Sequence, residues 1–313
     1  MPKRILTNHD LEKMVDTSDE WITVRTGIKE RRIALKQEKT SDLAIHAAEE
    51  AIKNGTIPAS EIDLIIVATA TPDSGFPSVA CLVQEAIHAK KAAAFDVAAA
   101  CSGFLYSLTT AKYYVASGQF QNALVIAAEK MSSVVDWNDR STCVLFGDGA
   151  GACVLAPTQE DAGILSEYVH AQGQHANLMS IVAEDIKPLD QNHPCIKKPY
   201  IEMNGQGLFK IAVRSMADAT KEAVRKAKLK ISDIDWIVPH QANDRIISGV
   251  AKALGLPKEK FFINIEKYGN MSAAAIAVAL YEAVAFKHIR KGDHVVLVTF
   301  GAGLVSAANV VRF

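Results

Sequence analysis

The sequence predicts an α/β protein made of two duplicated halves, stacked as five alternating layers of helix and sheet. Two observations lead to this class. The chain aligns with itself at a long offset, so that one half repeats the order of elements in the other. The expected strands are short apolar runs rather than alternating patterns, which is typical of sheets covered by helices on both faces.

The internal repeat is aligned by a shift of 172 residues, which places Ser60 on Ser232 without a gap. The segments paired at this or a closely similar shift are 60–66 with 232–238, 41–54 with 213–226, and 123–127 with 294–298. A period of this length indicates duplication of a whole domain, because solenoid units run to tens of residues. We expect one half over 1–160 and the other over 161–313, with the boundary near 157–163.

Two helices are almost wholly apolar: the one that begins near Phe104, and the one expected over 271–286. A helix that is apolar all round must be buried all round, so we place both between the two sheets. The second is too short to cross a bilayer and is interrupted by Tyr281 and Glu282. This arrangement produces the five layers.

The composition limits the possible partners and the cell compartment. The chain has 313 residues, enough for two domains, and a formal net charge of −1. That charge provides no global attraction to nucleic acid or an anionic membrane. The five cysteines are odd in number and form neither C-x-x-C pairs nor zinc-type clusters, which favours reduced thiols and no metal site. With no apolar signal core at the N-terminus, we expect a cytoplasmic protein.

Cys101 lies where the apolar run 92–97 gives way to the first apolar helix. The free N–H groups and positive dipole end of a helix favour a thiolate. The flanking alanines and Gly103 leave room for a substrate, and nearby backbone N–H groups could hold an oxyanion. The open alternative is a buried structural cysteine.

His240 ends an expected strand and precedes a helix, and Asn270 precedes the second apolar helix; both positions correspond to strand or helix ends in the first half. A duplicated fold brings such ends together, so we expect both beside Cys101. Alone, His240 could be a satisfied core histidine and Asn270 a loop or helix cap. Together the three residues predict a site for nucleophilic catalysis.

The first half carries an insertion over 130–146, and the second half joins the same two strands directly. Insertions on one side of a repeat often build the binding face. The glycine-rich run that follows, 147–151, precedes a strand instead of opening a helix. It therefore lacks the context of a dinucleotide loop.

Several motifs resemble one family along nearly the whole chain. They are TSDEWI at 17–22, RTGI at 25–28, FDVAAAC at 95–101, FGDGAG at 146–151, PHQAN at 239–243 and YGN at 268–270. They are similar to those of beta-ketoacyl-[acyl-carrier-protein] synthase III. The resemblance implies a thiolase-like fold, a homodimer and the first condensation of type II fatty-acid synthesis. Asn270 as the third catalytic residue fits this initiating type or the plant-type polyketide synthases. At that place elongating condensing enzymes have a second histidine, thiolases a second cysteine and hydroxymethylglutaryl-CoA synthases a glutamate.

The resemblance also implies a mechanism and its participants. Cys101, His240 and Asn270 would be catalytic, with the backbone N–H groups of Cys101 and Ala302 as the oxyanion hole. The partners would be acetyl-CoA or another short acyl-CoA and malonyl-acyl carrier protein. Coenzyme A thioester would enter as substrate, with no separate cofactor and no metal.

Binding residues are implied in the same way. Trp21 and Arg140 would sandwich the adenine of coenzyme A, as suits an indole and a guanidinium. The remaining implied residues are Thr17, Arg25 and Asn243 for coenzyme A; Leu145, Phe146 and Phe209 for the acyl pocket, with Phe76 closing the pocket of the neighbouring subunit; and Lys210, Arg214, Arg245 and Lys252 for carrier-protein docking. The alternative for each of these last four residues is an ordinary charged side chain on the solvent-exposed face of a helix.

Two departures from the family pattern lie near the C-terminus. The sequence has Gly301-Ala302-Gly303 where three glycines are usual, which brings a methyl group near the implied oxyanion hole. Residues 304–308 replace an aromatic segment and are expected to reshape the acyl pocket.

Three other functions remain open from the residues. A synthase of secondary metabolism with another acyl-CoA starter or acceptor would keep the fold. A Cys-His-Asn hydrolase would share the residue types but lacks the protease-like signature around its cysteine. A non-catalytic carrier-protein or acyl-CoA binding module would have no need of all three groups.

The repeat also predicts a missing strand. The second half begins with a strand expected over 163–170, and the 172-residue shift places its counterpart before Met1. We expect a late start, by start-site choice or trimming, that leaves the first sheet one strand short with an exposed edge.

Overall fold

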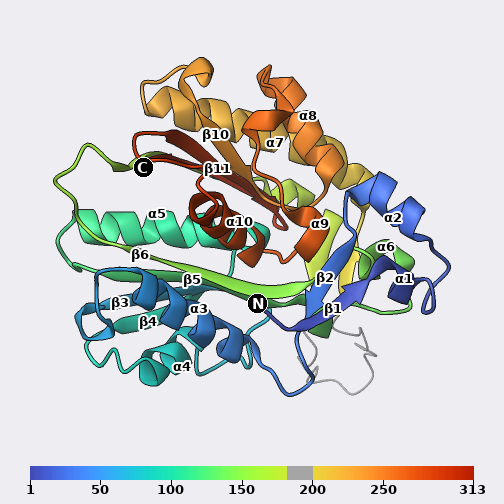
Figure 1. Cartoon of the computed structure of the whole chain (residues 1–313), viewed down its shortest axis with the longest axis horizontal. Coiled ribbons are helices and arrows are strands. Elements are labelled where there is room, and N and C mark those ends of the chain that lie inside the picture. Colours follow the sequence, from blue (N-terminus) through green and yellow to red (C-terminus); the bar gives the residue numbers. More distant parts are fainter. Residues whose placement is uncertain (182–199) are drawn as a thin grey trace.

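The computed structural model describes residues 1–181 and 200–313. Among these residues, two four-stranded sheets are separated and flanked by helices, in the order helix, sheet, helix, sheet, helix (Figure 1). The chain leaves the first sheet after Leu155 and enters the second at Gly163. The five-layer α/β arrangement predicted from the sequence is confirmed.

The first sheet has the strand order β4-β3-β5-β6. Its central strand β3 runs parallel to both neighbours, and β6 runs antiparallel to β5. The strands are β3 (Leu64–Ala68), β4 (Ala93–Val97), β5 (Ala123–Lys130) and β6 (Asp148–Leu155). The central strand β3 is buried along its whole length, because helices cover both of its faces.

The second sheet repeats this plan in the order β10-β11-β12-β7. Strands β10 and β11 are parallel, and the other two pairs are antiparallel. The counterpart of β4 is reduced to one parallel bridge between Ile237 and Phe261. The strands are β7 (Gly163–Ala171), β10 (Trp236–Pro239), β11 (His294–Gly301) and β12 (Val305–Arg312).

Helices α5 (Gly103–Ala116) and α10 (Ala274–Ala285) form the inner layer. One buried cluster joins them to both sheets, with Ile66 from β3 and Leu297 from β11 on opposite sides. The predicted burial on all sides is confirmed for the inner turns of both helices. Near their far ends some side chains reach solvent, and Tyr113 is one of them.

Four helices cover the outer faces of the sheets. Helices α3 and α4 share a buried cluster with β3 and β5. Helices α7 and α8 share another with β10 and β11. Their bounds are α3 (Thr40–Asn54), α4 (Val79–Ala86), α7 (Gly205–Lys226) and α8 (Asp244–Leu254).

The remaining elements gather at one end of the layered body, at the right of Figure 1. They share a fourth buried cluster, which includes Leu11, Ile22, Phe146 and Ile265. The elements are β1 (Arg4–Thr7), α1 (Asn8–Leu11), α2 (Asp19–Thr26), β2 (Glu30–Ile33), α6 (Arg140–Cys143), β8 (Met179–Ile181), β9 (Ile201–Met203) and α9 (Ile265–Tyr268). Strand β1 pairs with β2 in a separate two-stranded sheet.

Strand β6 of the first sheet corresponds to β12 of the second. In the second sheet β7 pairs with the outer edge of β12, whereas the first sheet ends at β6. Among the described residues, no strand pairs with this outer edge of β6. A cavity of about 450 Å³ lies there between α3, β6 and α10, and Met1 is part of its wall. The described part of the first half therefore lacks a counterpart of β7, as the repeat predicts.

The glycine-rich run before β6 has a packing role. Asp148 is buried, and its carboxylate accepts hydrogen bonds from the backbone N–H groups of Ala34 (2.7 Å) and Ser132 (2.8 Å). A Cβ atom at Gly147 would lie 2.4 Å from the carbonyl oxygen of Tyr268. Glycine is therefore required for close approach of two chain segments, in agreement with the rejection of a dinucleotide loop.

Candidate active site

A cavity of about 620 Å³ opens between the two halves of the duplicated fold. Cys101, His240 and Asn270 all contribute to its wall, together with Gly301 at the end of β11. The cysteine comes from the first half and the other two from the second. The structure thus brings together the three residues that the sequence predicted to meet.

Cys101 lies in a 3-10 turn (Ala100–Ser102) that leads directly into α5. The preceding residue, Ala100, has a φ of +44°, a left-handed conformation that is strained for a residue with a side chain. Gly301 packs against the cysteine so closely that a Cβ atom at 301 would lie 2.8 Å from the Cys101 nitrogen. The end of β11 therefore lies directly against the backbone of Cys101.

The protonation state of Cys101 differs from the expectation. The side chain is 3% exposed, and burial raises the pKa of the thiol to about 12. Loss of hydration penalises the thiolate more than the nearby helix start favours it. Burial thus opposes the thiolate that the start of the helix was expected to favour.

His240 follows the last residue of β10, and its backbone N–H donates to the carbonyl oxygen of Val298 in β11 (2.8 Å). The ring is 3% exposed, and burial lowers its pKa to about 4. The ring is therefore neutral at physiological pH. Its Nδ1 atom has no hydrogen-bond partner among the described residues, which is unlike the satisfied core histidine considered above.

Asn270 is held by the insertion of the first half. Its backbone N–H donates to the carbonyl oxygen of Leu145 (2.9 Å), and its own carbonyl accepts from Gly147 (3.1 Å). Its side-chain oxygen accepts from the backbone N–H of Ser272 (2.9 Å), which leaves the amide NH2 as the free donor. A Cβ atom at Gly269, whose φ is +63°, would lie 2.7 Å from the Leu145 oxygen. Only glycine permits this close contact.

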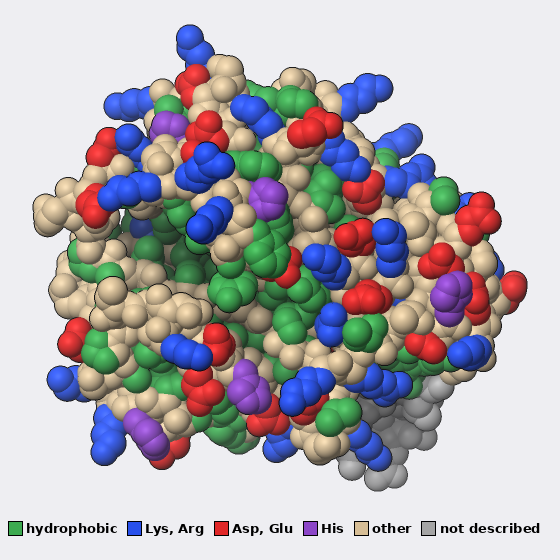
Figure 2. Space-filling model, in the orientation of Figure 1, with side chains coloured by type: hydrophobic (Ala, Val, Ile, Leu, Met, Phe, Trp, Pro, Cys, Tyr) green, Lys and Arg blue, Asp and Glu red, His purple; other side chains and the backbone are tan. Residues whose placement is uncertain are grey.

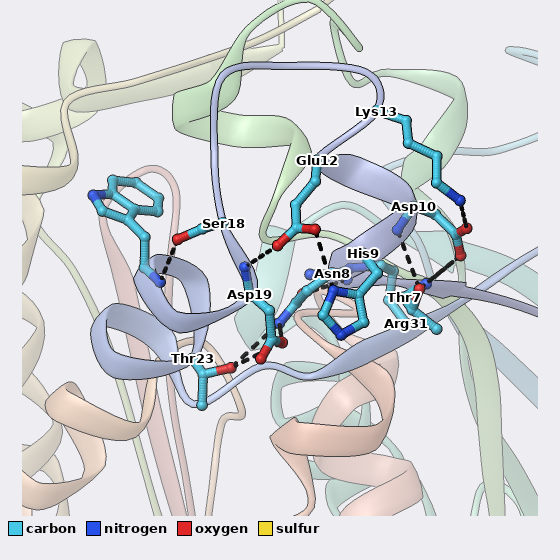
Figure 3. Close-up of polar contacts among 11 residues, drawn as sticks. Thr7, Asn8, His9, Asp10, Glu12, Lys13, Ser18, Asp19, Thr23 and Arg31 are labelled. Atoms are coloured by element: carbon cyan, nitrogen blue, oxygen red, sulfur yellow. Dashed lines mark hydrogen bonds and ion pairs between the residues drawn. The ribbon is translucent and has the colours of Figure 1, made fainter.

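Arg31 lies among polar residues of the N-terminal segment (Figure 3) and ties that segment to the same wall. This side chain is fully buried and donates to Oδ1 of Asn8 (2.8 Å) and to the carbonyl oxygen of Val144 (2.7 Å). Asn8 in turn donates to Asp19 at the start of α2 (2.9 Å). Val144 directly precedes Leu145, which lines the cavity. The sequence analysis missed Arg31, because three of the four residues of its strand β2 (Glu30–Ile33) are charged and the sequence does not single out one of them as buried.

Three of the residues implied for coenzyme A, namely Trp21, Arg25 and Arg140, form a cluster, and Arg25 also lines the cavity. The guanidinium of Arg25 lies 4.9 Å from the centre of the Trp21 ring, and that of Arg140 lies 5.2 Å from it. Arg140 also donates to the carbonyl oxygen of Asp16 (2.7 Å). Because Trp21 and Arg140 already touch, a base can enter between them only if Arg140 moves aside.

Thr17 and Asn243 occupy different settings. The hydroxyl of Thr17 is buried without a hydrogen-bond partner in the described part of the chain. Asn243 lines the cavity, but its side chain also caps α8 by accepting from Arg245 (2.8 Å) and donates to the carbonyl oxygen of Arg25 (3.1 Å). Helix capping thus explains much of the environment of Asn243.

The four residues implied for the acyl pocket separate into three groups. Leu145 and Phe209 line the cavity. The ring of Phe146 packs into the buried cluster with Leu11 and Ile22 and does not line the cavity in this structure. Phe76 lies away from this cavity and is 89% exposed. Met179 and Met203, from the short strands β8 and β9, line the cavity and were missed because neither strand has a distinctive pattern.

The four cationic residues implied for docking lie on α7 and α8, the layer at the top of Figure 2, where many Lys and Arg side chains are visible. Lys210 and Arg245 line the cavity, and the Arg245 guanidinium lies 5.8 Å from the centre of the Phe209 ring. Arg214 pairs with Asp218 (3.5 Å) and lines a neighbouring cavity instead. Lys252 is exposed on α8.

Cysteine, metal and membrane features complete the description. Cys81, Cys101, Cys143 and Cys153 are free thiols, and Cys195 lies outside the described residues. Across 1–181 and 200–313, no group of three or more His, Cys, Asp or Glu side chains is arranged to hold a metal ion. None of the helices in those two ranges is long and apolar enough to cross a membrane.

Comparison with known proteins agrees with this geometry. The family model "3-Oxoacyl-[acyl-carrier-protein (ACP)] synthase III" matches residues 95–173, and the model of its C-terminal part matches 224–313. Beta-ketoacyl-[acyl-carrier-protein] synthase III of Aquifex aeolicus is 49% identical over 313 residues, which cover 100% of this chain and 96% of the relative. The same enzyme of Symbiobacterium thermophilum is 50% identical, with 100% and 95% covered.

Solved structures are similar over the same length. The Aquifex aeolicus synthase III superposes with a TM-score of 0.93 at 48% identity, with 100% of this chain and 97% of that chain covered. The priming beta-ketosynthase of the R1128 polyketide pathway has the same TM-score at 33% identity, covering 99% and 93%. The duplicated layers define an enzyme of the thiolase fold. The chain belongs to the beta-ketoacyl-[acyl-carrier-protein] synthase III family and is an acyltransferase of that type.

Proposed function

We propose that this enzyme condenses acetyl-CoA, or another short acyl-CoA, with malonyl-acyl carrier protein. The reaction releases carbon dioxide, forms 3-ketoacyl-acyl carrier protein and starts type II fatty-acid synthesis. The observation that carries the proposal is the meeting of Cys101, His240 and Asn270 in one cavity of a synthase III family member. The cavity is large enough for a thioester arm and a short acyl chain.

The first half-reaction is acyl transfer to Cys101. The thiol loses its proton and attacks the thioester carbonyl, a C–S bond forms to the enzyme, and coenzyme A leaves. Backbone N–H groups of Cys101 and Ala302 hold the developing oxyanion. Supporting this role, Gly301 brings the end of β11 directly against Cys101, and Ala302 is the next residue. The Ala302 side chain is a methyl group, but its backbone N–H is retained.

The second half-reaction uses His240 and Asn270. Malonyl-carrier protein loses carbon dioxide, and the resulting enolate attacks the acyl-cysteine. Neutral His240 and the Asn270 amide donate hydrogen bonds to the thioester oxygen, where negative charge develops. Support comes from the low pKa of His240, which keeps the ring neutral, and from the engaged side-chain oxygen of Asn270, which leaves its NH2 as donor.

Coenzyme A is proposed to bind along Trp21, Arg25 and Arg140, with Thr17 and Asn243 beside it. Stacking on an indole and a guanidinium suits an adenine ring. The contact of Arg140 with Trp21 implies that Arg140 moves away from the ring when the coenzyme A thioester binds. Its bond to the Asp16 carbonyl would break in that movement.

We also propose a homodimer located in the cytosol. Strand β4 forms an edge of the first sheet and pairs with β3 alone among the described strands. Phe76, 89% exposed, is an apolar ring that a second subunit would cover, and there it would close the acyl pocket of its neighbour. The free thiols Cys81, Cys101, Cys143 and Cys153 agree with a reducing compartment.

The acyl starter is identified by the group that remains on the enzyme. We expect the intact mass of the protein to rise by one acetyl group after incubation with acetyl-CoA, and less completely with longer acyl-CoAs in a mixed panel. The structural likeness to a polyketide-priming synthase keeps a secondary-metabolism starter as the second candidate. Exclusive loading of a longer or branched acyl group would favour that candidate, and no loading from any acyl-CoA would contradict the proposed function.

Carrier-protein docking is proposed for Lys210, Arg214, Arg245 and Lys252. We predict that Lys252→Glu raises the KM for malonyl-carrier protein by roughly tenfold and leaves acetyl transfer from acetyl-CoA unchanged, because charge at a rim acts on association. Raised salt should weaken the wild-type interaction in the same direction. Lys252 is a cleaner probe than Arg245, since Arg245 also stacks on Phe209 inside the cavity.

The matched control for this docking experiment is Lys53→Glu, which places the same charge change on the exposed side of α3 in the opposite outer layer. This control should change neither the KM for malonyl-carrier protein nor the rate of acetyl transfer from acetyl-CoA. Equal effects of Lys252→Glu on both substrates would remove the case for a docking patch.

A further inference from the structure

Arg31 of β2 is a fully buried arginine. In the described part of the chain its guanidinium donates to neutral oxygens rather than to a carboxylate. These are the Leu6 carbonyl (3.2 Å), the Asn8 side chain (2.8 Å) and the Val144 carbonyl (2.7 Å). Burial lowers the pKa of the guanidinium to about 10, so the group is charged at neutral pH. A buried cation without a counter-ion costs stability, so an apolar side chain would serve packing alone better.

Asn8 fixes one side of this guanidinium (Figure 3). The side-chain NH2 of Asn8 donates to the Ile28 carbonyl (2.7 Å) and to Asp19 (2.9 Å). Its side-chain oxygen is therefore the atom left to face Arg31. One terminal nitrogen of Arg31 is thus anchored in the N-terminal segment, and the other donates to Val144.

Residues 144–147 hold the backbone of Asn270 from both directions. The carbonyl of Leu145 accepts the Asn270 N–H (2.9 Å), and the N–H of Gly147 donates to the Asn270 carbonyl (3.1 Å). The two bonds form an isolated parallel bridge. Because the side-chain oxygen of Asn270 is fixed by the Ser272 N–H, the direction of its NH2 depends on where this bridge lies.

Arg31 contacts this bridge with both its guanidinium and its stem. The Val144 carbonyl, which accepts from the guanidinium, begins the segment that pairs with Asn270. Cβ atoms added at Gly147 and Gly269 would lie 3.0 Å and 3.4 Å from the Cβ atom of Arg31. One buried side chain therefore touches both chain segments that meet at the bridge.

We propose that Arg31 is a positioning residue for condensation, which holds residues 144–147 in place and so aims the Asn270 amide at the thioester oxygen. The use of that amide rests on the proposed function. Arg31 acts through Asn270, because its own side chain is fully buried and does not line the cavity. A shift of about 1 Å in an active-site group can cost up to roughly a hundredfold in rate, so a loosened bridge should be visible in the kinetics.

The test variant is Arg31→Lys, which keeps the positive charge and most of the stem. A lysine ends in one nitrogen, so it cannot reach the Asn8 and Val144 oxygens from two fixed directions as the planar guanidinium does. The matched control is Arg32→Lys at the next position of β2, where the guanidinium pairs with Glu30 (3.3 Å). The same chemical change is thus made with and without contact to the bridge.

The first measurement is backbone hydrogen exchange in the full-length enzyme, followed by mass spectrometry of peptides that cover 144–148 and 268–273. The N–H groups of Gly147 and Asn270 close the bridge. We expect both to exchange at least about fivefold faster in Arg31→Lys, because local opening becomes easier. Exchange in β3, and in all peptides of Arg32→Lys, should stay at the wild-type rate. This measurement needs no substrate.

The second measurement is a double-mutant cycle in single-turnover condensation that starts from acetyl-enzyme. We expect Arg31→Lys to lower the condensation rate by about tenfold, with acetyl loading and the KM for malonyl-carrier protein within about twofold of the wild type. In an Asn270→Ala background the same substitution should change the rate by less than about twofold, because the amide that Arg31 positions is gone. A general loss of structure would instead act by the same factor in both backgrounds.

Equal losses in the two backgrounds, or unchanged exchange at Gly147 and Asn270, would overturn the proposal. If Arg31→Lys does not fold, Asn8→Ala replaces it, since it removes one acceptor of the same guanidinium and should speed the same exchange by about threefold. If Asn270→Ala condenses at the wild-type rate, the proposed function of that amide has failed. The exchange measurement then still decides whether Arg31 holds Asn270.

Discussion

The Cys101→Ala variant is expected to take up no acetyl group from acetyl-CoA. In the proposed function the Cys101 sulfur is the atom that forms the acyl bond, and no other thiol of the described residues lines the cavity. Loss of a covalent nucleophile should lower the overall condensation rate by at least about a thousandfold, since such residues account for losses of this order or more in other enzymes. The measurement is acid-stable radiolabel on the protein after incubation with labelled acetyl-CoA.

The control for this variant is Cys81→Ala, which removes an exposed thiol on α4 and should leave labelling unchanged. A melting curve close to that of the wild type shows that Cys101→Ala is folded. If Cys101→Ala still carries label on a thiol at the wild-type level, the nucleophile has been assigned to the wrong residue.

The His240→Ala variant is expected to behave in the opposite way, with acetyl loading retained and condensation lost. In the proposed mechanism His240 acts on the enolate rather than on the thiol, so its removal should spare the first half-reaction. Removal of one such hydrogen-bond donor costs about 3 kcal/mol of transition-state stabilisation, which corresponds to roughly a hundredfold in rate. Asn270→Ala should show the same separation of the two steps. Single-turnover assays, with acetyl-enzyme mixed with malonyl-carrier protein, measure the second step alone.

His46→Ala is the matched control, because His46 is exposed on α3 far from Cys101 in the fold. The pH dependence offers an independent check. Burial lowers the pKa of His240 to about 4, so the ring stays neutral above about pH 5 and condensation should not fall through His240 until the pH approaches 4. A parallel loss of loading and condensation in His240→Ala would contradict the assignment of His240 to the second step.

The architecture could be predicted because its signals are local in sequence and repeated. Apolar runs such as those of β3 and β10 indicate strands by themselves, and the 172-residue offset ties the two halves to one plan. The inner helices were recognised from their composition, since only a position between two sheets can bury such surfaces. The same reasoning placed Cys101, His240 and Asn270 together, because each follows an element whose end faces the other half.

The coenzyme A and acyl-pocket residues were predictable only in part. A motif identifies a residue type at a position, but the direction of its side chain depends on neighbours that are distant in sequence. Phe146 adjoins Leu145, yet one ring enters the buried cluster and the other side chain faces the cavity. Likewise the contact between Trp21 and Arg140 joins α2 to α6, which are far apart in the sequence because strands β3, β4 and β5 lie between them.

By itself the sequence determined the order of elements, the duplication and the identity of the three residues at the cavity, because periodicity, composition and motifs are properties of the chain alone. Only the tertiary structure decided that burial raises the pKa of the Cys101 thiol and that Gly301 packs against the backbone of Cys101. The physical reason is that both outcomes depend on burial and on contacts between residues from different halves. Cys101 lies just before α5 and Gly301 at the end of β11, and the packing of the inner layer against the second sheet brings them together.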